Sequence, residues 1–208
     1  MKKYRFLMVF ALACFMSTGI AFAEGEKPAA EQPAAKPAMD PAQMEKMKTL
    51  MAPGEAHKIF ESLAGKWTYT SKMWMPGADK PEESAGTSEN TVVYGGRFLK
   101  EDVKGTWMAQ PFEGTGYVGY DNVREEYQST WMDSMVTGIM WSSGKYDTAT
   151  KTLSMSGTNS CPMTGKKNVP GRTEWKVVDA THNTFSMYSA GPDGKEMKMM
   201  EIEYQKAA

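Results

Sequence analysis

The residues in this chain best suited to chemistry are Trp131 and Asp133, with two arginines in separate segments. Trp131 and Asp133 are two positions apart in a strand-like run, so their side chains lie on one face. Arg97 and Arg172 each follow a glycine and open a strand-like run. The run of Arg97 precedes the one with Trp131 and Asp133, and the run of Arg172 follows it. We hypothesise that one guanidinium group pairs with Asp133 or receives an acidic ligand head group. The alternative is an ion pair at a barrel rim, worth about 0–1 kcal/mol.

Known catalytic and metal-binding patterns are missing from the sequence. His57 and His182 lie in different segments, without neighbours at metal-ligand spacing, so zinc is not expected. A haem held by a single axial histidine is a minor alternative. The sequence also contains no nucleophile elbow of the kind that hydrolases use. We therefore predict no catalytic residue, no metal and no cofactor.

The run Gly114–Gly119 matches the dinucleotide-binding pattern G-x-G-x-x-G. That pattern requires a helix after the glycines, whereas Tyr120-Asp121-Asn122 predicts a turn into another strand. Glycines in a strand also permit tight curvature and close packing. We therefore predict a barrel strand here and no nucleotide site.

Methionine is unusually frequent, with 19 residues in the chain. Thioethers are soft ligands that suit Cu(I), and a minor alternative is a copper site among Met73/Met75, Met197/Met199 and Cys161/Met163. The methionines are dispersed, however, and methionine commonly fills irregular cores. A packing role is the main interpretation.

The N-terminal segment predicts export. Three basic residues precede an apolar run, and Ala21-Phe22-Ala23 forms a cleavage site, so we expect a signal peptide over 1–23. Its removal changes the formal net charge from −1 to −4 and leaves Cys161 as the one cysteine. We expect a periplasmic or secreted protein without an intrachain disulfide. The acidic balance is also unfavourable for nucleic acid.

A linker and two short helices are expected between the signal peptide and the strands. Residues 24–40 are rich in proline and alanine and predict a solvated linker. Asp40-Pro41 predicts a helix start, and a second apolar stripe begins near Pro53, so two short helices over 41–64 are expected to cap one mouth of a barrel.

From Gly65 to the C-terminus the apolar period is two, and turn residues separate about ten short runs. A meander of this length closes or splits into two sheets, and we favour closure. The expected fold is an all-β antiparallel barrel of about ten strands over 65–208. Trp67, which opens the first strand, and Tyr120 join Trp131, Asp133, Arg97 and Arg172 as predicted ligand-binding residues.

Six different short motifs follow one another along this region. They are Gly65-Lys66-Trp67, Gly95-Gly96-Arg97-Phe98-Leu99, Gly119-Tyr120-Asp121, Trp131-Met132-Asp133, Pro162-Met163-Thr164-Gly165-Lys166 and Gly191-Pro192-Asp193-Gly194-Lys195-Glu196. The series resembles the DUF1579 family, a family of unknown function grouped with calycin-like barrels such as lipocalins. The resemblance implies a calycin-like fold and no particular activity.

Three functions are compatible with such a barrel. Our main hypothesis is a monomer that binds a small apolar or amphipathic ligand without chemistry, because pockets of this kind are mostly apolar with a few polar groups. No nucleic acid partner and no stable membrane insertion after cleavage are expected. The alternatives are an enzyme that uses Asp133 as acid or base, and a structural or interaction module whose interior is filled by side chains.

Overall fold

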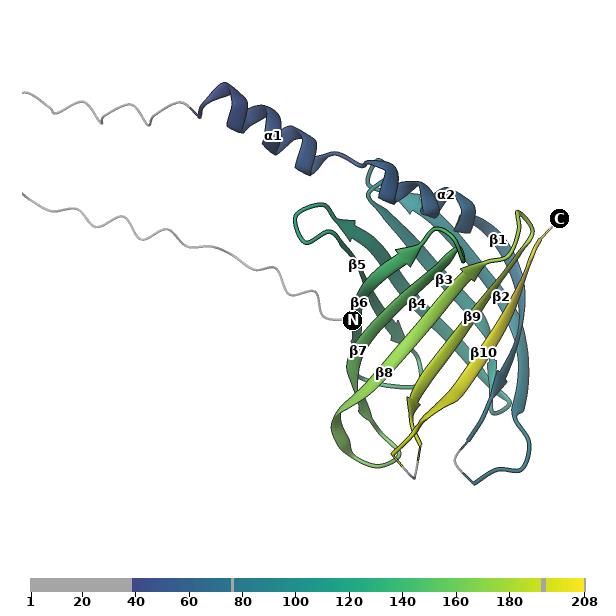
Figure 1. The fold of residues 1–208 in the computed structure, drawn as a ribbon. Coiled ribbons are helices and arrows are strands. Elements are labelled where there is room, and N and C mark those ends of the chain that lie inside the picture. Colours follow the sequence, from purple (N-terminus) through teal and green to yellow (C-terminus); the bar gives the residue numbers. More distant parts are fainter. Residues whose placement is uncertain (1–38, 76, 192–193, 208) are drawn as a thin grey trace, which may run out of the picture. The chain divides into compact units, whose positions relative to one another are not determined.

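Ten β-strands make up most of the protein (Figure 1). The computed structural model describes residues 39–75, 77–191 and 194–207. The predicted signal peptide and the predicted linker up to residue 38 lie outside the described residues. The strands are β1 (Gly65–Met73), β2 (Glu82–Val93), β3 (Phe98–Trp107), β4 (Gln110–Asp121), β5 (Glu126–Asp133), β6 (Met140–Asp147), β7 (Thr152–Cys161), β8 (Lys166–Val177), β9 (His182–Ala190) and β10 (Glu196–Lys206).

The strands form one closed antiparallel barrel. Each strand pairs with its neighbours in sequence, and β1 pairs with β10 to complete the circle. The closing pair is in continuous register, with Tyr69 opposite Tyr204 and Met73 opposite Met200. Closure leaves no unpaired edge along these strands. The predicted all-β barrel of about ten strands is therefore confirmed.

The clearest difference from the expected strands is at β8. The sequence predicts that this strand starts at Arg172, after Pro170-Gly171, but β8 already begins at Lys166. The chain reverses at the preceding Pro-Met-Thr-Gly segment instead, where Gly165 adopts a φ of 66°. Gly165 tolerates this left-handed conformation because it has no Cβ. Pro170 is exposed and pairs with Thr158 inside the strand.

Two helical segments precede the barrel. Helix α1 spans Pro41–Met51, and the Asp40 side chain accepts a hydrogen bond from the amide of Ala42. The second segment is a 3-10 turn, η1 (Glu55–Lys58), which continues into the five-residue helix α2 (Ile59–Leu63). No residue of α1 is buried. Within the described ranges, no helix is long and apolar enough to cross a membrane.

Helix α2 fills one end of the barrel (Figure 1). Ile59, Phe60 and Leu63 are 0–7% exposed. They belong to a single core cluster with residues of five strands, namely Leu99, Val118, Tyr127, Leu153, Met155 and Trp175. Because these strands lie around the circumference, the short helix is packed as a plug. A smaller second cluster consists of Trp67, Tyr69, Val103 and Tyr204.

Candidate functional site

The interior face of the barrel changes character along its axis. Near α2 the inward-facing side chains are buried, as Leu99 and Leu153 at 0% exposure show. Farther from α2, inward-facing residues keep part of their surface accessible; examples are Trp107, Trp131, Thr173, Phe185, Met187 and Ile202. Because strand neighbours cover these residues on the sides, we infer that this accessible surface faces the interior.

Glu101 is an ionisable side chain of the interior. It lies on β3 between Leu99 and Val103, two buried residues that share its inward face. Its Oε1 accepts a hydrogen bond of 3.3 Å from the hydroxyl of Tyr204 and lies 3.3 Å from Oγ of Ser88. No described residue donates a hydrogen bond to Oε2. Burial raises the pKa of Glu101 to about 7.

Burial favours the neutral form of Glu101, whereas its hydrogen bonds with Tyr204 and Ser88 lower its pKa. Ser88 Oγ lies 2.7 Å from Oδ1 of Asn90, closer than its 3.3 Å contact with Glu101. A hydroxyl has one proton, so Ser88 cannot donate to both groups. If Ser88 donates to Asn90, a protonated Glu101 can donate to Ser88 in turn. Asn90 Nδ2 completes the chain by donating to the Leu63 carbonyl at 3.0 Å, which connects the network to α2.

A second interior polar atom lacks a partner. Asn183 is 1% exposed and lies opposite Tyr204 in the β9–β10 register. Its Oδ1 accepts a 2.6 Å hydrogen bond from Trp175 Nε1, but Nδ2 is buried without a partner among the described residues. The interior therefore holds an unbonded acceptor at Glu101 Oε2, and an unbonded donor at Asn183 Nδ2 that is fully buried amid apolar side chains.

Trp131 lies in the same cross-strand row as Glu101. Glu101 is opposite Gly116 on β4, and Gly116 is opposite Trp131 on β5. A Cβ at Gly116 would lie 2.8 Å from the Trp131 ring, and one at Gly114 would lie 2.3 Å from it. The glycines thus allow the indole to lie flat over β4, which explains them without a nucleotide site.

The Asp133 carboxylate is engaged in hydrogen bonds that hold the local structure. Its Oδ2 accepts a 2.9 Å hydrogen bond from Trp131 Nε1, and its Oδ1 accepts from the amides of Met135 and Val136 at 2.9 and 3.2 Å. The carboxylate therefore fixes the turn after β5 and orients Trp131. These bonds occupy both of its oxygens, which is unfavourable for an acid or base.

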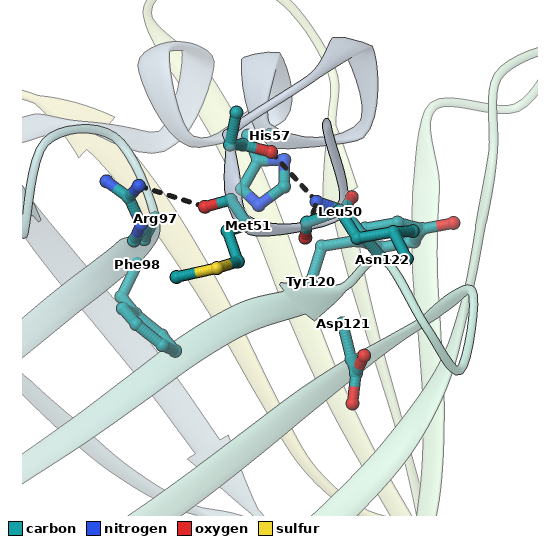
Figure 2. Close-up of a pocket in the computed structure, with 9 residues that line it drawn as sticks. Leu50, Met51, His57, Arg97, Phe98, Tyr120, Asp121 and Asn122 are labelled. Atoms are coloured by element: carbon teal, nitrogen blue, oxygen red, sulfur yellow. Dashed lines mark hydrogen bonds between the residues drawn. The ribbon is translucent and has the colours of Figure 1, made fainter. Parts of the chain in front are cut away.

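Arg97 and Tyr120 come together outside the lumen. They line a shallow pocket of about 170 Å³ between the end of α1 and β4 (Figure 2). Arg97 Nη2 donates to the Met51 carbonyl at 2.9 Å, and Asn122 Nδ2 donates to the carbonyls of Leu50 and Ala52 at 2.9 and 2.8 Å. These donors satisfy carbonyls at the C-terminal end of α1.

His57 borders the same pocket. Its ring contacts the rings of Phe60 and Tyr120 edge to face, and its Nδ1 accepts a 3.0 Å hydrogen bond from the Gly54 amide. Burial is the main reason why the pKa of His57 is lowered. The residue is thus part of the packing between η1 and β4. The sequence-based haem alternative gains no support from this environment.

The remaining two predicted residues lie on opposite faces of the barrel wall. Arg172 is on the outer face, where it pairs with Glu174 and Glu196 and lies 4.0 Å from the centre of the Tyr188 ring. It does not pair with Asp133. Trp67 is 1% exposed, and its Nε1 donates to the Leu63 carbonyl at 3.0 Å. Trp67 therefore connects β1 to α2 in the core.

Sequence reasoning missed Glu101, Ser88 and Tyr204. The sequence pattern could have indicated Glu101, because the alternation Leu99, Glu101, Val103 places a carboxylate on an apolar strand face. Ser88 and Tyr204 carry no comparable signal. They meet Glu101 through pairing of β3 with β2 and through closure of β10 onto β1.

The docking of α1 can be tested at its three side-chain hydrogen bonds. Because α1 buries no residue, we expect the double substitution R97A/N122A to release it. Each bond contributes about 0.5–1.5 kcal/mol, so amide hydrogen exchange over residues 41–52 should increase by at least about tenfold. Arg124→Ala, which removes an exposed arginine from the adjacent turn, is the matched control and should leave exchange unchanged. Unaltered protection in the double variant would contradict this account of α1.

The fold and its interior define a small closed β-barrel with one plugged end and a partly accessible polar centre. Residues 52–206 match the family model described as a protein of unknown function (DUF1579). The chain belongs to this family. A search of curated proteins found no match.

The solved structures that match this chain include one with the same type of fold. Rv2717c from M. tuberculosis is 15% identical, with a TM-score of 0.57, and the match covers 76% of this chain and 100% of that one. A redesigned β barrel, mFAP0, bound to DFHBI is 15% identical over 70% of this chain and 99% of its own, with a TM-score of 0.38. EF1p2_mFAP2b bound to DFHBI is 10% identical over 74% and 100%, with a TM-score of 0.41.

Proposed function

We propose that this protein binds a small amphipathic molecule inside a calycin-like barrel, without transforming it. One observation carries the proposal: Glu101 presents an unbonded oxygen in an interior whose inward-facing side chains are partly accessible. Binding sites for small molecules are mostly apolar, with a few polar groups that orient the ligand. We further propose that the protein is exported, with cleavage after Ala23.

The ligand chemistry follows from the unbonded oxygen of Glu101. Glu101, with a pKa near 7, can accept from a hydroxyl or an amine, and in its protonated form it can donate. Asn183 Nδ2 is fully buried, so it is not a contact for this ligand. A ligand with an apolar body and a hydroxyl or amine at one end would bond to Glu101. Phe185 and Ile202 supply apolar surface on neighbouring strands.

A catalytic role for Glu101 is the second candidate, because a carboxyl with a pKa near 7 suits acid–base catalysis at neutral pH. Its hydrogen-bond neighbours are the hydroxyls of Ser88 and Tyr204. Burial and the nearby Glu101 raise the pKa of Tyr204 well above its usual value, so its hydroxyl is not an activated nucleophile. Ser88 Oγ lies closer to Asn90 Oδ1 than to Glu101. Binding without chemistry is therefore the better-supported function.

The binding proposal is tested by filling the interior. Thr173 faces inward from β8 and is partly accessible, whereas Thr87 faces outward from β2 and is exposed. We expect the wild type and Thr87→Trp to take up the lipophilic dye Nile red with enhanced fluorescence, and Thr173→Trp to lose this uptake. Native mass spectrometry of protein purified without detergent would reveal a co-purified ligand.

Two outcomes would overturn this function. The first is a wild-type protein that takes up no dye and carries no co-purified molecule. The second is equal dye uptake by Thr173→Trp and Thr87→Trp at equal folded content, since the dye would then be bound outside the barrel. A filled interior would additionally make Thr173→Trp strongly destabilising, because overpacking costs about 1–3 kcal/mol.

A further inference from the structure

Three methionines form a continuous row across the closing strands of the barrel. Met73 on β1 is opposite Met200 on β10, and Met200 is opposite Met187 on β9. Directly paired residues of antiparallel strands have Cβ atoms about 4.5–5.5 Å apart and point to one face. The three side chains are therefore immediate neighbours, although up to 127 positions separate them in the sequence.

The row points into the barrel. Met73 lies on the same face of β1 as Trp67, Tyr69 and Ser71, because alternate residues of a strand point to one side. The side chains of those three residues are buried on the inward face. The same register places Tyr69 opposite Tyr204, and Tyr204 opposite Asn183, in the buried interior. The irregularity of β10 lies between Lys198 and Met200, beyond this register, so it does not turn Met200 outward.

The Met73 thioether is oriented by a neighbour in the interior. Trp107 Nε1 donates a hydrogen bond of 3.2 Å to Sδ of Met73. This bond engages one lone pair of the thioether sulfur and leaves the second for another partner. On its other side, Met73 is opposite Glu82 on β2, so a carboxylate stands at the end of the methionine row.

We propose that Met73, Met187 and Met200 bind a soft monovalent cation, Cu(I) or Ag(I), inside the barrel. Thioether sulfur selects such ions, and Glu82 supplies a compensating negative charge. Among the described residues, no group of three or more His, Cys, Asp or Glu side chains could hold a metal ion. This proposal is independent of the proposed binding of an amphipathic molecule.

The test uses Ag(I), which needs no reductant, and Cu(I) in competition with bicinchoninate. Cys161 is a free thiol and a strong soft ligand, so all proteins carry Cys161→Ser. We expect this background to bind one ion in native mass spectrometry, and its M73L/M187L/M200L derivative to lose that ion. Leucine conserves the side-chain volume closely. The control is M44L/M47L/M51L, which removes three exposed thioethers from α1 and should retain the ion.

A site-resolved measurement supports the same test. In protein labelled with ¹³C at the methionine methyl groups, the signals of Met73, Met187 and Met200 should shift together and saturate at one equivalent of Ag(I). The proposal is overturned if the Cys161→Ser protein binds no ion, if the interior triple variant retains it, or if the α1 variant loses it. Equal loss in both triple variants would likewise refute it, since the ion would then depend on methionine content alone.

Discussion

Phe60→Ala is expected to lower the free energy of unfolding by about 3–5 kcal/mol. Phe60 is 0% exposed, and its ring meets the rings of His57 and Tyr127 edge to face. The substitution leaves a cavity between α2 and five strands, which the closed barrel cannot fill by collapsing. Urea denaturation followed by tryptophan fluorescence measures the loss.

Met47→Ala is the matched control for this prediction. Met47 is an apolar residue of the neighbouring helix α1, but it is 40% exposed. Its substitution should change the free energy of unfolding by no more than about 0.5 kcal/mol. If Phe60→Ala costs less than about 1 kcal/mol, α2 is not the plug that the structure describes.

Glu101→Gln is expected to remove a pH dependence of stability. Burial raises the pKa of Glu101 from 4.5 to about 7, so the folded protein retains a proton that the unfolded chain releases. The stability that Glu101 contributes is fully present below pH 4.5, where both states are protonated, and is lost as the pH rises from 4.5 to 7. The total loss is about 3 kcal/mol, and it is complete above pH 7.

The difference between the two proteins isolates this effect. His57, whose pKa is lowered, reduces stability at acidic pH, but it does so equally in the wild type and in Glu101→Gln. Unfolding measured by denaturant between pH 4 and 8 should therefore give a difference curve that favours the variant increasingly up to pH 7. Glu113→Gln, at an exposed outer position, should give a flat difference curve. A flat curve for Glu101→Gln would place the carboxyl in a solvated environment.

The barrel itself could be predicted in considerable detail. Alternating apolar residues and turn chemistry indicated ten runs, and all ten are strands in the structure. The error at β8 has a local cause: Pro170-Gly171 is typical of a turn, but the pairing of β7 with β8 holds this segment extended. Pairing across a sheet overrides a local preference that is worth about 1 kcal/mol.

Only part of the site could be predicted from the sequence. Trp131 lies in the interior row with Glu101, as the shared strand face allowed, while Asp133 and Arg172 are engaged in local structure and a surface ion pair. A single sequence shows which residues share a face of a strand. It does not show which face turns inward, because both faces of β5 and β8 carry polar residues.

The all-β class, the order of the strands and their meander connectivity follow from the sequence, because these depend on neighbours along the chain. Which side chains meet across the barrel depends on the three-dimensional fold. Glu101 reaches Tyr204, and Met73 reaches Met187 and Met200, through the closure of β10 onto β1. Closure joins the two ends of the barrel sequence, and the register of that distant pairing is a property of the whole sheet.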